Sequence, residues 1–155
     1  MKLSSKAEYA VRAMAGLAAW YGNGPVPLSQ VSEREGISQD YLEHIMASLR
    51  RQGLVESARG VKGGYSLAMP PEQISIRDIM WALDGPFVPI ECLEHAGADQ
   101  GACCYGKLKP ECTTRVVWVR LQESVTSAME SITLADLLKG GYTQALPLDK
   151  EAVTA

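Results

Sequence analysis

The feature that most restricts the fold of this chain is a pair of short helical patterns followed at once by a glycine-rich hairpin. Residues 28–35 have one helical pattern, and a second begins after Ser38, so only Gly36-Ile37 separates them. Two short β segments follow, at 54–58 and 65–67, on either side of the sequence RGVKGG. Three glycines in six residues predict a hairpin tip with positive backbone angles. Two helices, a tight turn and a two-stranded wing together indicate a winged helix-turn-helix.

Further helices are expected on both sides of this unit. The first covers residues 5–20, with Ser5 and Glu8 as a capping box. The helix after Ser38 buries Leu42, Ile45, Met46 and Leu49. After Pro70-Pro71, a helix capped by Ser75 has the apolar face Ile76, Ile79, Met80 and Leu83. The class is therefore mainly α.

The C-terminal part contains a long helix with an apolar stripe. From Thr113 onward, apolar residues recur at spacings of three and four, at Trp118, Leu121, Val125, Ala128 and Ile132. This heptad-like stripe favours a helix that pairs with its twin in a homodimer, and the alternative is packing against its own domain. The residues Thr133 and Asp136 predict the start of a last short helix.

The charge of the chain is unevenly distributed. Residues 1–65 have eight Lys and Arg against six Asp and Glu, a net charge of +2, whereas residues 66–155 have seven against twelve, a net charge of −5. Only the first part suits a nucleic acid. Because the start lacks the apolar region of a signal peptide and no apolar run is long enough to span a bilayer, we expect a cytoplasmic protein without membrane contact.

The residues expected to read DNA bases lie at the N-terminal end of the second helix of the helix-turn-helix, because that end enters the major groove. The Gln39 amide can pair with adenine, and the Glu43 carboxylate can accept a hydrogen bond from cytosine. A solvent-exposed helix face without a role in DNA reading explains Glu43 almost as well. Tyr41 either holds a phosphate or packs. The base-reading candidates are Ser38, Gln39, Tyr41 and Glu43.

Four basic residues are expected to contact the DNA backbone or the minor groove. Arg50 and Arg51 end the recognition helix, where positive charge suits both the helix dipole and phosphates. Arg59 at the wing tip fits a narrow minor groove. Lys62 beside it is a weaker candidate for a phosphate contact.

All four cysteines, Cys92, Cys103, Cys104 and Cys112, fall within 21 residues. In a reducing compartment, clustered thiols indicate a metal or redox site. The spacing C-x10-C-C-x7-C lacks the close C-x2-4-C pair of a zinc knuckle, so it favours an iron-sulfur cluster. The neighbours Cys103 and Cys104 cannot easily bind the same iron, so one of them is a spare or has a redox role.

Several motifs carry a resemblance to a known family. The sequences MKLSSKAEYAVRAM, PVPLSQVSEREGIS, YLEHIMASLRRQGLVESARGVKGGYSLA and SITLADLL occur in order over residues 1 to about 140. They resemble the IscR-like winged-helix transcription regulators. The resemblance implies a homodimer crossed by long C-terminal helices. It also implies that three loop cysteines hold a [2Fe-2S] or [4Fe-4S] cluster in the members that sense, with the two-iron form favoured here.

The resemblance also carries over a ligand set with one clear departure. Cluster-assembly regulators have a histidine ligand three residues after the last cysteine, where this chain has Arg115. For the middle position Cys104 is favoured over Cys103. In some similar regulators the fourth ligand is an early acidic residue of the partner, which corresponds to Glu8 of the partner subunit. A capping role is the alternative for that carboxylate, and His95 is a lesser candidate for the ligand.

These patterns lead to a functional prediction. The chain is expected to be a homodimeric DNA-binding regulator that binds a palindromic operator and senses iron-sulfur or redox status. A zinc or thiol-redox regulator is the alternative. A cysteine-dependent enzyme or carrier is disfavoured, because no nucleophile-base-orienter set accompanies the thiols. The expected parts are a DNA-binding domain (1–84), a cluster loop (85–112), a dimerisation region (113–140) and a flexible tail (141–155).

Overall fold

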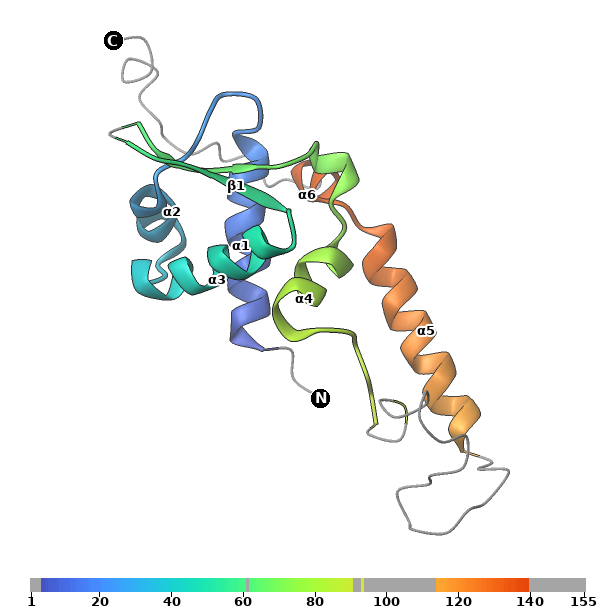
Figure 1. Ribbon diagram of the computed structural model, residues 1–155. Helices are drawn as coiled ribbons and strands as arrows, with labels where there is room; N and C mark the ends of the chain where they lie inside the picture. Colours follow the sequence, from blue (N-terminus) through green and yellow to red (C-terminus); the bar gives the residue numbers. More distant parts are fainter. Residues whose placement is uncertain (1–3, 61, 91–92, 94–113, 140–155) are drawn as a thin grey trace.

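A computed structural model describes residues 4–60, 62–90, 93 and 114–139. The described part of the chain confirms the predicted mainly α winged helix-turn-helix (Figure 1). Its elements in chain order are α1 (Ser5–Ala19), α2 (Leu28–Glu35), α3 (Gln39–Arg51), β1 (Val55–Ala58), β2 (Gly64–Leu67), η1 (Pro71–Gln73), α4 (Ile76–Asp84), α5 (Arg115–Ser131) and α6 (Leu134–Lys139).

The core forms around α1, which packs against α2, α3, α4, α6 and β2. Residues 13–18 of this helix are all buried, as expected for a central helix that has neighbours on several sides. The largest fully buried side chains come from α1, α2, α3, β1, α4 and α6 and from the segment before α4. They include Met14, Val31, Leu42, Ile45, Met46, Leu49, Val55, Ile74, Ile79 and Leu134. Residues that are far apart in the sequence therefore share one hydrophobic core.

The helix-turn-helix follows the predicted pattern closely. Gly36 ends α2 in the left-handed conformation, with φ 65°, and the buried Ile37 fills the turn. The predicted apolar face of α3 is fully buried. Ser38 is the N-cap residue of α3, as predicted, but its side chain makes no capping hydrogen bond. Because α3 buries its apolar face in the core, the opposite face of the helix is exposed.

The wing differs from its predicted backbone geometry. β1 and β2 pair antiparallel, and an isolated bridge joins Val26 to Tyr65 with N–O distances of 2.8 and 2.9 Å. The predicted positive backbone angle is confirmed at Gly60, with φ of 107°, but not at Gly63 or Gly64. Gly63 and Gly64 are required for space instead, because a Cβ atom at Gly64 would collide with the Val26 carbonyl.

The predicted capping box of Ser5 and Glu8 is also wrong. The N-cap residue of α1 is Ser4, whose Oγ accepts a hydrogen bond from the Ala7 amide at 3.1 Å. The Ser4 hydroxyl also donates to Asp84 Oδ2 at 2.6 Å, at the end of α4. This tertiary contact favours Ser4 over its neighbour, and it leaves the Glu8 side chain outside the cap.

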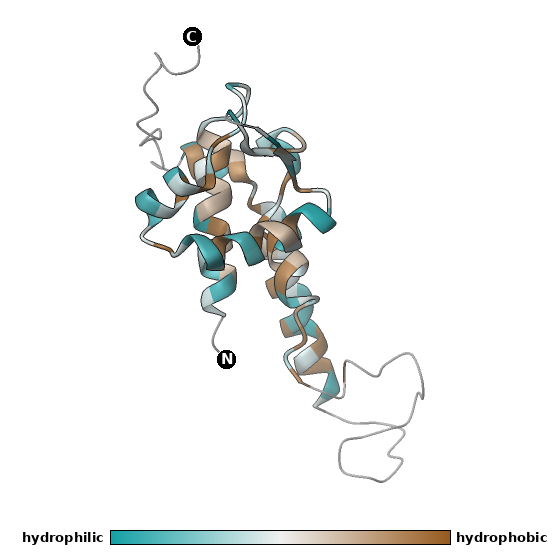
Figure 2. Ribbon diagram, turned by 60° about the vertical axis from the view of Figure 1, so that its left-hand side comes forward, coloured by the Kyte–Doolittle hydropathy of each residue, from teal (hydrophilic) through white to brown (hydrophobic). Residues whose placement is uncertain are grey.

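The helix α5 projects from the domain and is joined to it near its C-terminal end (Figure 1). None of its residues is buried, although hydrophobic residues occur along its length (Figure 2). The predicted start of the last helix is confirmed, because Thr133 and Asp136 cap α6 reciprocally with distances of 3.0 and 3.3 Å. Within the described residues, no helix is both long and apolar enough to cross a membrane.

Candidate nucleic-acid interface

The N-terminal half of α3 presents the predicted base-reading residues to solvent. Ser38, Gln39, Tyr41 and Glu43 are all exposed, because the same helix buries its opposite face in the core. The Gln39 side-chain amide lies 3.5 Å from Glu43 Oε1, one turn further along the helix. The two side chains are thus neighbours on one surface, and this long hydrogen bond can be exchanged for bonds to base edges.

Tyr41 packs against the first helix. Its ring meets that of Tyr9 edge to face, with a centroid distance of 5.9 Å and an interplanar angle of 88°. Such pairs stabilise a fixed ring arrangement beyond the area that they bury. Tyr9 was not among the sequence candidates. Its contact with Tyr41 ties the start of the recognition helix to α1.

The basic residues at the end of α3 have local partners. Arg50 Nη1 donates to Ser57 Oγ at 3.1 Å, which joins α3 to strand β1 of the wing. Arg51 Nη2 donates to Ser48 Oγ at 3.1 Å within the helix. Both residues remain exposed, so they combine a positioning role with positive charge on the expected phosphate side.

Arg59 and Lys62 flank the wing tip, and both are exposed. Over the described residues, Arg59 forms no hydrogen bond or ion pair, so its guanidinium is available to a groove. A guanidinium on a glycine-containing tip can enter a narrow minor groove with little obstruction from neighbouring side chains. The structure thus brings α3 and the wing tip together as two exposed parts of one domain.

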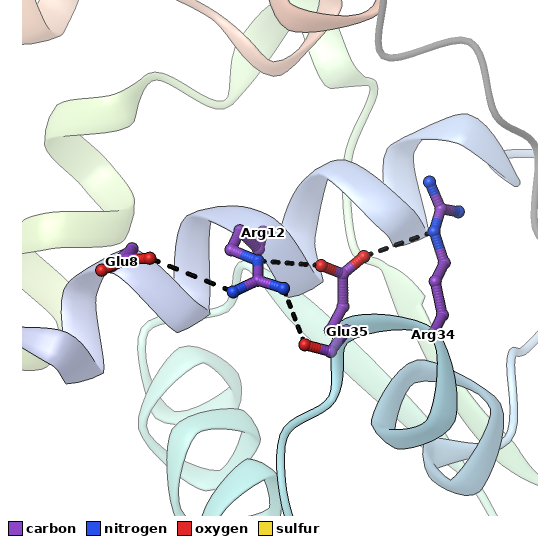
Figure 3. A network of polar contacts seen from close by, with 4 residues as sticks. All are labelled: Glu8, Arg12, Arg34 and Glu35. Carbon is purple, nitrogen blue, oxygen red and sulfur yellow. Dashed lines mark hydrogen bonds and ion pairs between the residues drawn. The ribbon is translucent and has the colours of Figure 1, made fainter.

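A polar network fixes the end of α2 against α1 (Figure 3). The Glu35 side chain is only 6% exposed, and its carboxylate accepts from Arg12 Nε at 3.0 Å and lies 3.3 Å from Arg34 Nε. Arg12 Nη2 also donates to the Glu35 backbone carbonyl at 2.7 Å. A buried carboxylate is tolerated only when it is paired and hydrogen-bonded in this way. The network therefore positions the turn that leads into α3.

Sequence reasoning missed this network, although one signal was present. In α2 the residues Leu28, Val31 and Glu35 recur at spacings of three and four, so the helical period places a carboxylate on the buried face. A charged residue at such a position needs a cationic partner. The partner Arg12 lies 23 positions away in the sequence, so the pattern in α2 alone could not identify it.

The predicted metal ligands are only partly covered by the structure. Cys92, His95, Cys103, Cys104 and Cys112 lie outside the described residues. The Glu8 side chain is 66% exposed and reaches Arg12 Nη1 only at 4.0 Å (Figure 3). Among residues 4–60, 62–90, 93 and 114–139, no group of three or more His, Cys, Asp or Glu is arranged to hold a metal ion.

Comparison with known proteins identifies the family. A family model described as "Rrf2: Iron-dependent Transcriptional regulator" matches residues 3–140. The HTH-type transcriptional regulator IscR of Aliivibrio salmonicida is 36% identical over 155 residues, which is 100% of this chain and 87% of that protein.

Solved structures agree with this assignment. The structure of "T. potens IscR" is similar with a TM-score of 0.71 and 38% identity, over 90% of this chain and 88% of that one. The structure of CymR, "the Global Cysteine Regulator of B. subtilis", has a TM-score of 0.74 and 33% identity, over 90% and 98% of the two chains. These relatives are named as regulators and not as enzymes. The chain belongs to the Rrf2 family of winged-helix transcriptional regulators, and it is a DNA-binding regulator.

Proposed function

We propose that this DNA-binding regulator is a cytoplasmic homodimer that reads a palindromic operator and senses iron-sulfur or redox status through a cysteine-ligated cluster. The observation that carries this proposal is the set of four cysteines within 21 residues, in a chain that matches a family described as iron-dependent. Soft thiolate ligands suit iron-sulfur clusters. The DNA-reading part of the proposal depends on α3 and the wing.

The exposed residues of α3 and the wing support a two-part contact with DNA. In this proposal Gln39 and Glu43 meet base edges in the major groove, and the exposed Ser38 and Tyr41 lie beside them. Arg59 reaches the minor groove while Lys62, Arg50 and Arg51 contact phosphates. The bond from Arg50 to Ser57 holds the wing in a fixed relation to α3. One domain therefore reads one half-site.

Exposed apolar residues support dimerisation through α5. Val116, Val117 and Leu121 are 54%, 57% and 38% exposed, and Trp81 of α4 is 45% exposed. A helix with large apolar side chains and no buried residue needs a partner surface. A second copy of the same helix satisfies this need through a two-fold axis, and the axis in turn requires a palindromic site.

The residues present fit an iron-sulfur cluster. Cys92, Cys112 and one of Cys103 and Cys104 supply thiolates, with Cys104 favoured. Glu8 of the partner subunit fits as a fourth ligand, because in this structure its carboxylate is exposed and takes no part in the helix cap. A bound cluster of this kind supplies a redox-active centre whose potential depends on its ligands. We expect a [2Fe-2S] cluster rather than a [4Fe-4S] cluster.

The Arg12 network supports a connection from Glu8 to the DNA-binding helices. Arg12 lies between the Glu8 and Glu35 carboxylates, at 4.0 and 3.0 Å. A movement of the Glu8 carboxylate changes the charge around Arg12. Arg12 in turn holds the last residue of α2, immediately before the turn into α3. In the proposed dimer, the Glu8, Arg12 and Glu35 side chains of the subunit that supplies the fourth ligand therefore connect the cluster to the recognition helix of that same subunit.

An absorbance spectrum of anaerobically purified protein tests the cluster. The wild type is expected to show visible cluster absorption, which Cys92→Ser or Cys112→Ser abolishes. Of Cys103→Ser and Cys104→Ser only one is expected to abolish it, so the spare cysteine provides the matched control. Glu8→Ala tests the fourth ligand against Glu8→Gln, which keeps an oxygen donor but loses the charge.

The alternative is a zinc or thiol-redox regulator on the same scaffold, favoured by the neighbouring pair Cys103-Cys104. Protein that contains zinc or no metal after anaerobic reconstitution, with all four cysteines reduced, would exclude the cluster. That result would leave DNA binding by α3 and the wing intact. Metal analysis and thiol titration on the same sample distinguish the two regulators.

A further inference from the structure

We propose that Arg77 fixes the angle at which α5 leaves the winged domain, and that it thereby sets the spacing between the two operator half-sites that the dimer accepts. This inference rests on the proposed dimerisation through α5. It assigns a specificity-determining role to residues outside α3 and the wing.

The C-terminal end of α5 is joined to the domain by a short β-bridge. Ser75 and Thr133 form this bridge, in which the Ile76 amide donates to the Ile132 carbonyl and the Leu134 amide to the Ile74 carbonyl, each at 2.9 Å. Ile132 is in an extended conformation and ends the helix. The bridge fixes the point at which the C-terminal end of α5 joins the domain. A single bridge of this kind does not fix the direction of the helix axis.

Arg77 of α4 supplies a contact that restricts this direction. Its Nη1 lies 2.7 Å from Glu130 Oε1, in the last turn of α5. Its guanidinium carbon lies 4.3 Å from the centroid of the Trp81 ring on the same side of α4. The indole face limits the positions that the guanidinium can take, so the ion pair with Glu130 acts on α5 from a fixed point.

A second polar contact lies further along the helix. Gln122 Nε2 donates to the Phe87 carbonyl at 2.9 Å, in the segment that follows α4. It is eight residues before Glu130, which corresponds to about 12 Å along an α-helix. Two points at this separation define a direction. Between α4 and α5 lies a cavity of about 670 Å³, lined by residues that include Trp81, Phe87 and Met129.

The cavity leaves part of the boundary between α4 and α5 without close apolar packing. Tightly packed helices resist reorientation because their side chains interdigitate. Here residues of both helices line the cavity, and α5 has no buried residue. The polar contacts of Arg77 and Gln122 therefore have more influence on the helix direction than they would in a close-packed pair.

In a two-fold dimer the direction of α5 determines how far apart the two recognition helices lie. Operator half-sites must match that separation to within a small fraction of a helical turn, because each added base pair both moves one half-site along the duplex and rotates it about the duplex axis. A dimer with a fixed angle accepts one spacing well and its neighbours poorly, whereas a dimer with a loose angle accepts several. The Arg77 contact is thus expected to contribute to spacing specificity without changing the affinity of one domain for one half-site.

The test measures binding to duplexes whose two half-sites are moved apart in single base-pair steps. The half-site sequence comes from DNA that the wild type selects from a random pool. The variants are Arg77→Met, which removes the ion pair and the cation–π interaction with Trp81, and Glu130→Gln, which removes only the ion pair. Glu123→Gln makes the same charge change on an exposed position of α5 and serves as the control.

For Glu130→Gln, the affinity ratio between the best spacing and its neighbours is expected to fall about two- to fivefold, the scale of a partly exposed ion pair. For Arg77→Met the fall is expected to be larger, up to about tenfold. Half-site affinity, dimerisation in sedimentation and the Glu123→Gln ratios are expected to match the wild type.

An unchanged spacing preference in both variants, with the dimer intact, would overturn the role of Arg77 alone. An equal loss of half-site affinity would also overturn it, because Arg77 would then act through the fold of the domain. A monomeric wild type would overturn the proposed dimer as well as the role of Arg77. Sedimentation therefore distinguishes a failure of the proposed dimer from a failure of the Arg77 proposal alone.

Discussion

The helices α3 and α5 have similar apolar stripes in the sequence, but they differ in what the stripes meet. In α3 the residues Leu42, Ile45, Met46 and Leu49 are fully buried against the rest of the domain. In α5 no residue is buried, and Leu121 remains 38% exposed. Helical periodicity therefore identifies a face that needs a partner, and the tertiary structure shows whether the chain itself supplies that partner.

The largest expected effect comes from placing charge on the apolar stripe of α5. This change distinguishes the role of α5 from that of α3. Leu121→Glu together with Val125→Glu is expected to dissociate the proposed dimer, because two carboxylates in an apolar interface cost several kcal/mol. Sedimentation and circular dichroism measure assembly and folding on the same sample. Ser124→Glu, at an exposed position of α5, is expected to remain dimeric. A double variant that stays a folded dimer would show that residues 113–131 are not the dimer helix.

Truncation of one apolar side chain in each helix sharpens the comparison. Leu42→Ala is expected to lower the free energy of unfolding by about 2 to 5 kcal/mol, since it leaves a cavity in the core. Leu121→Ala is expected to weaken self-association and to affect the unfolding of the winged domain much less. Denaturant titrations at several protein concentrations measure both quantities. Equal losses of folding stability, independent of concentration, would place the two side chains in equivalent environments.

The wing gives an intermediate effect on DNA binding. Arg59→Ala is expected to weaken operator binding by roughly 1 to 3 kcal/mol, the scale of one good groove contact, and to leave the fold intact. Lys62→Ala is expected to cost less and to reduce the salt dependence by about one phosphate contact. Fluorescence anisotropy at several salt concentrations distinguishes these outcomes. If Arg59→Ala binds the operator like the wild type at fixed salt, the wing has no role in recognition.

The smallest expected effect concerns the anchor of α6. Hydrogen bonds from the Thr133 amide and hydroxyl, and then Lys139, lower the pKa of Asp136 below its ordinary value of 3.8. Because the folded pKa is the lower one, the carboxylate stabilises the fold above the ordinary pKa, and this contribution is lost as the pH falls through the folded value.

Asp136→Asn is therefore expected to be less stable than the wild type near neutral pH, with a difference that shrinks in acid. Thr133→Ala removes the hydroxyl but keeps the backbone amide donor, so it should show a smaller pH-dependent difference. Thermal melting between pH of about 2 and 7 gives the comparison. A stability difference that does not change with pH would mean that ionised Asp136 contributes nothing to the cap.

Local patterns predicted the helices, the strands and the exposed face of α3, but they did not predict contacts between residues that are distant in the sequence. The αL glycine at Gly36, the apolar face of α3 and the cap formed by Thr133 all depend on neighbours within a few positions. The N-cap of α1 was misplaced by one residue because Asp84, 80 positions away, binds Ser4.

The wing and the charged network show the same limit. Gly64 is required by the approach of the Val26 carbonyl rather than by its own backbone angle, so composition alone suggested the wrong cause. The pairs Arg12–Glu35 and Arg77–Glu130 join helices whose relative placement no single-helix pattern contains. The roles of the cysteines as cluster ligands remain predictions from the sequence.

The proposed coupling between cluster state and DNA binding is tested most directly by anaerobic titration of one palindromic operator with cluster-loaded and cluster-free protein at the same salt concentration. A duplex with one half-site serves as the reference. The account predicts that the two forms differ in affinity for the palindrome by about fivefold or more, the lower range of allosteric coupling. Equal affinities of the two forms for the palindrome would contradict it.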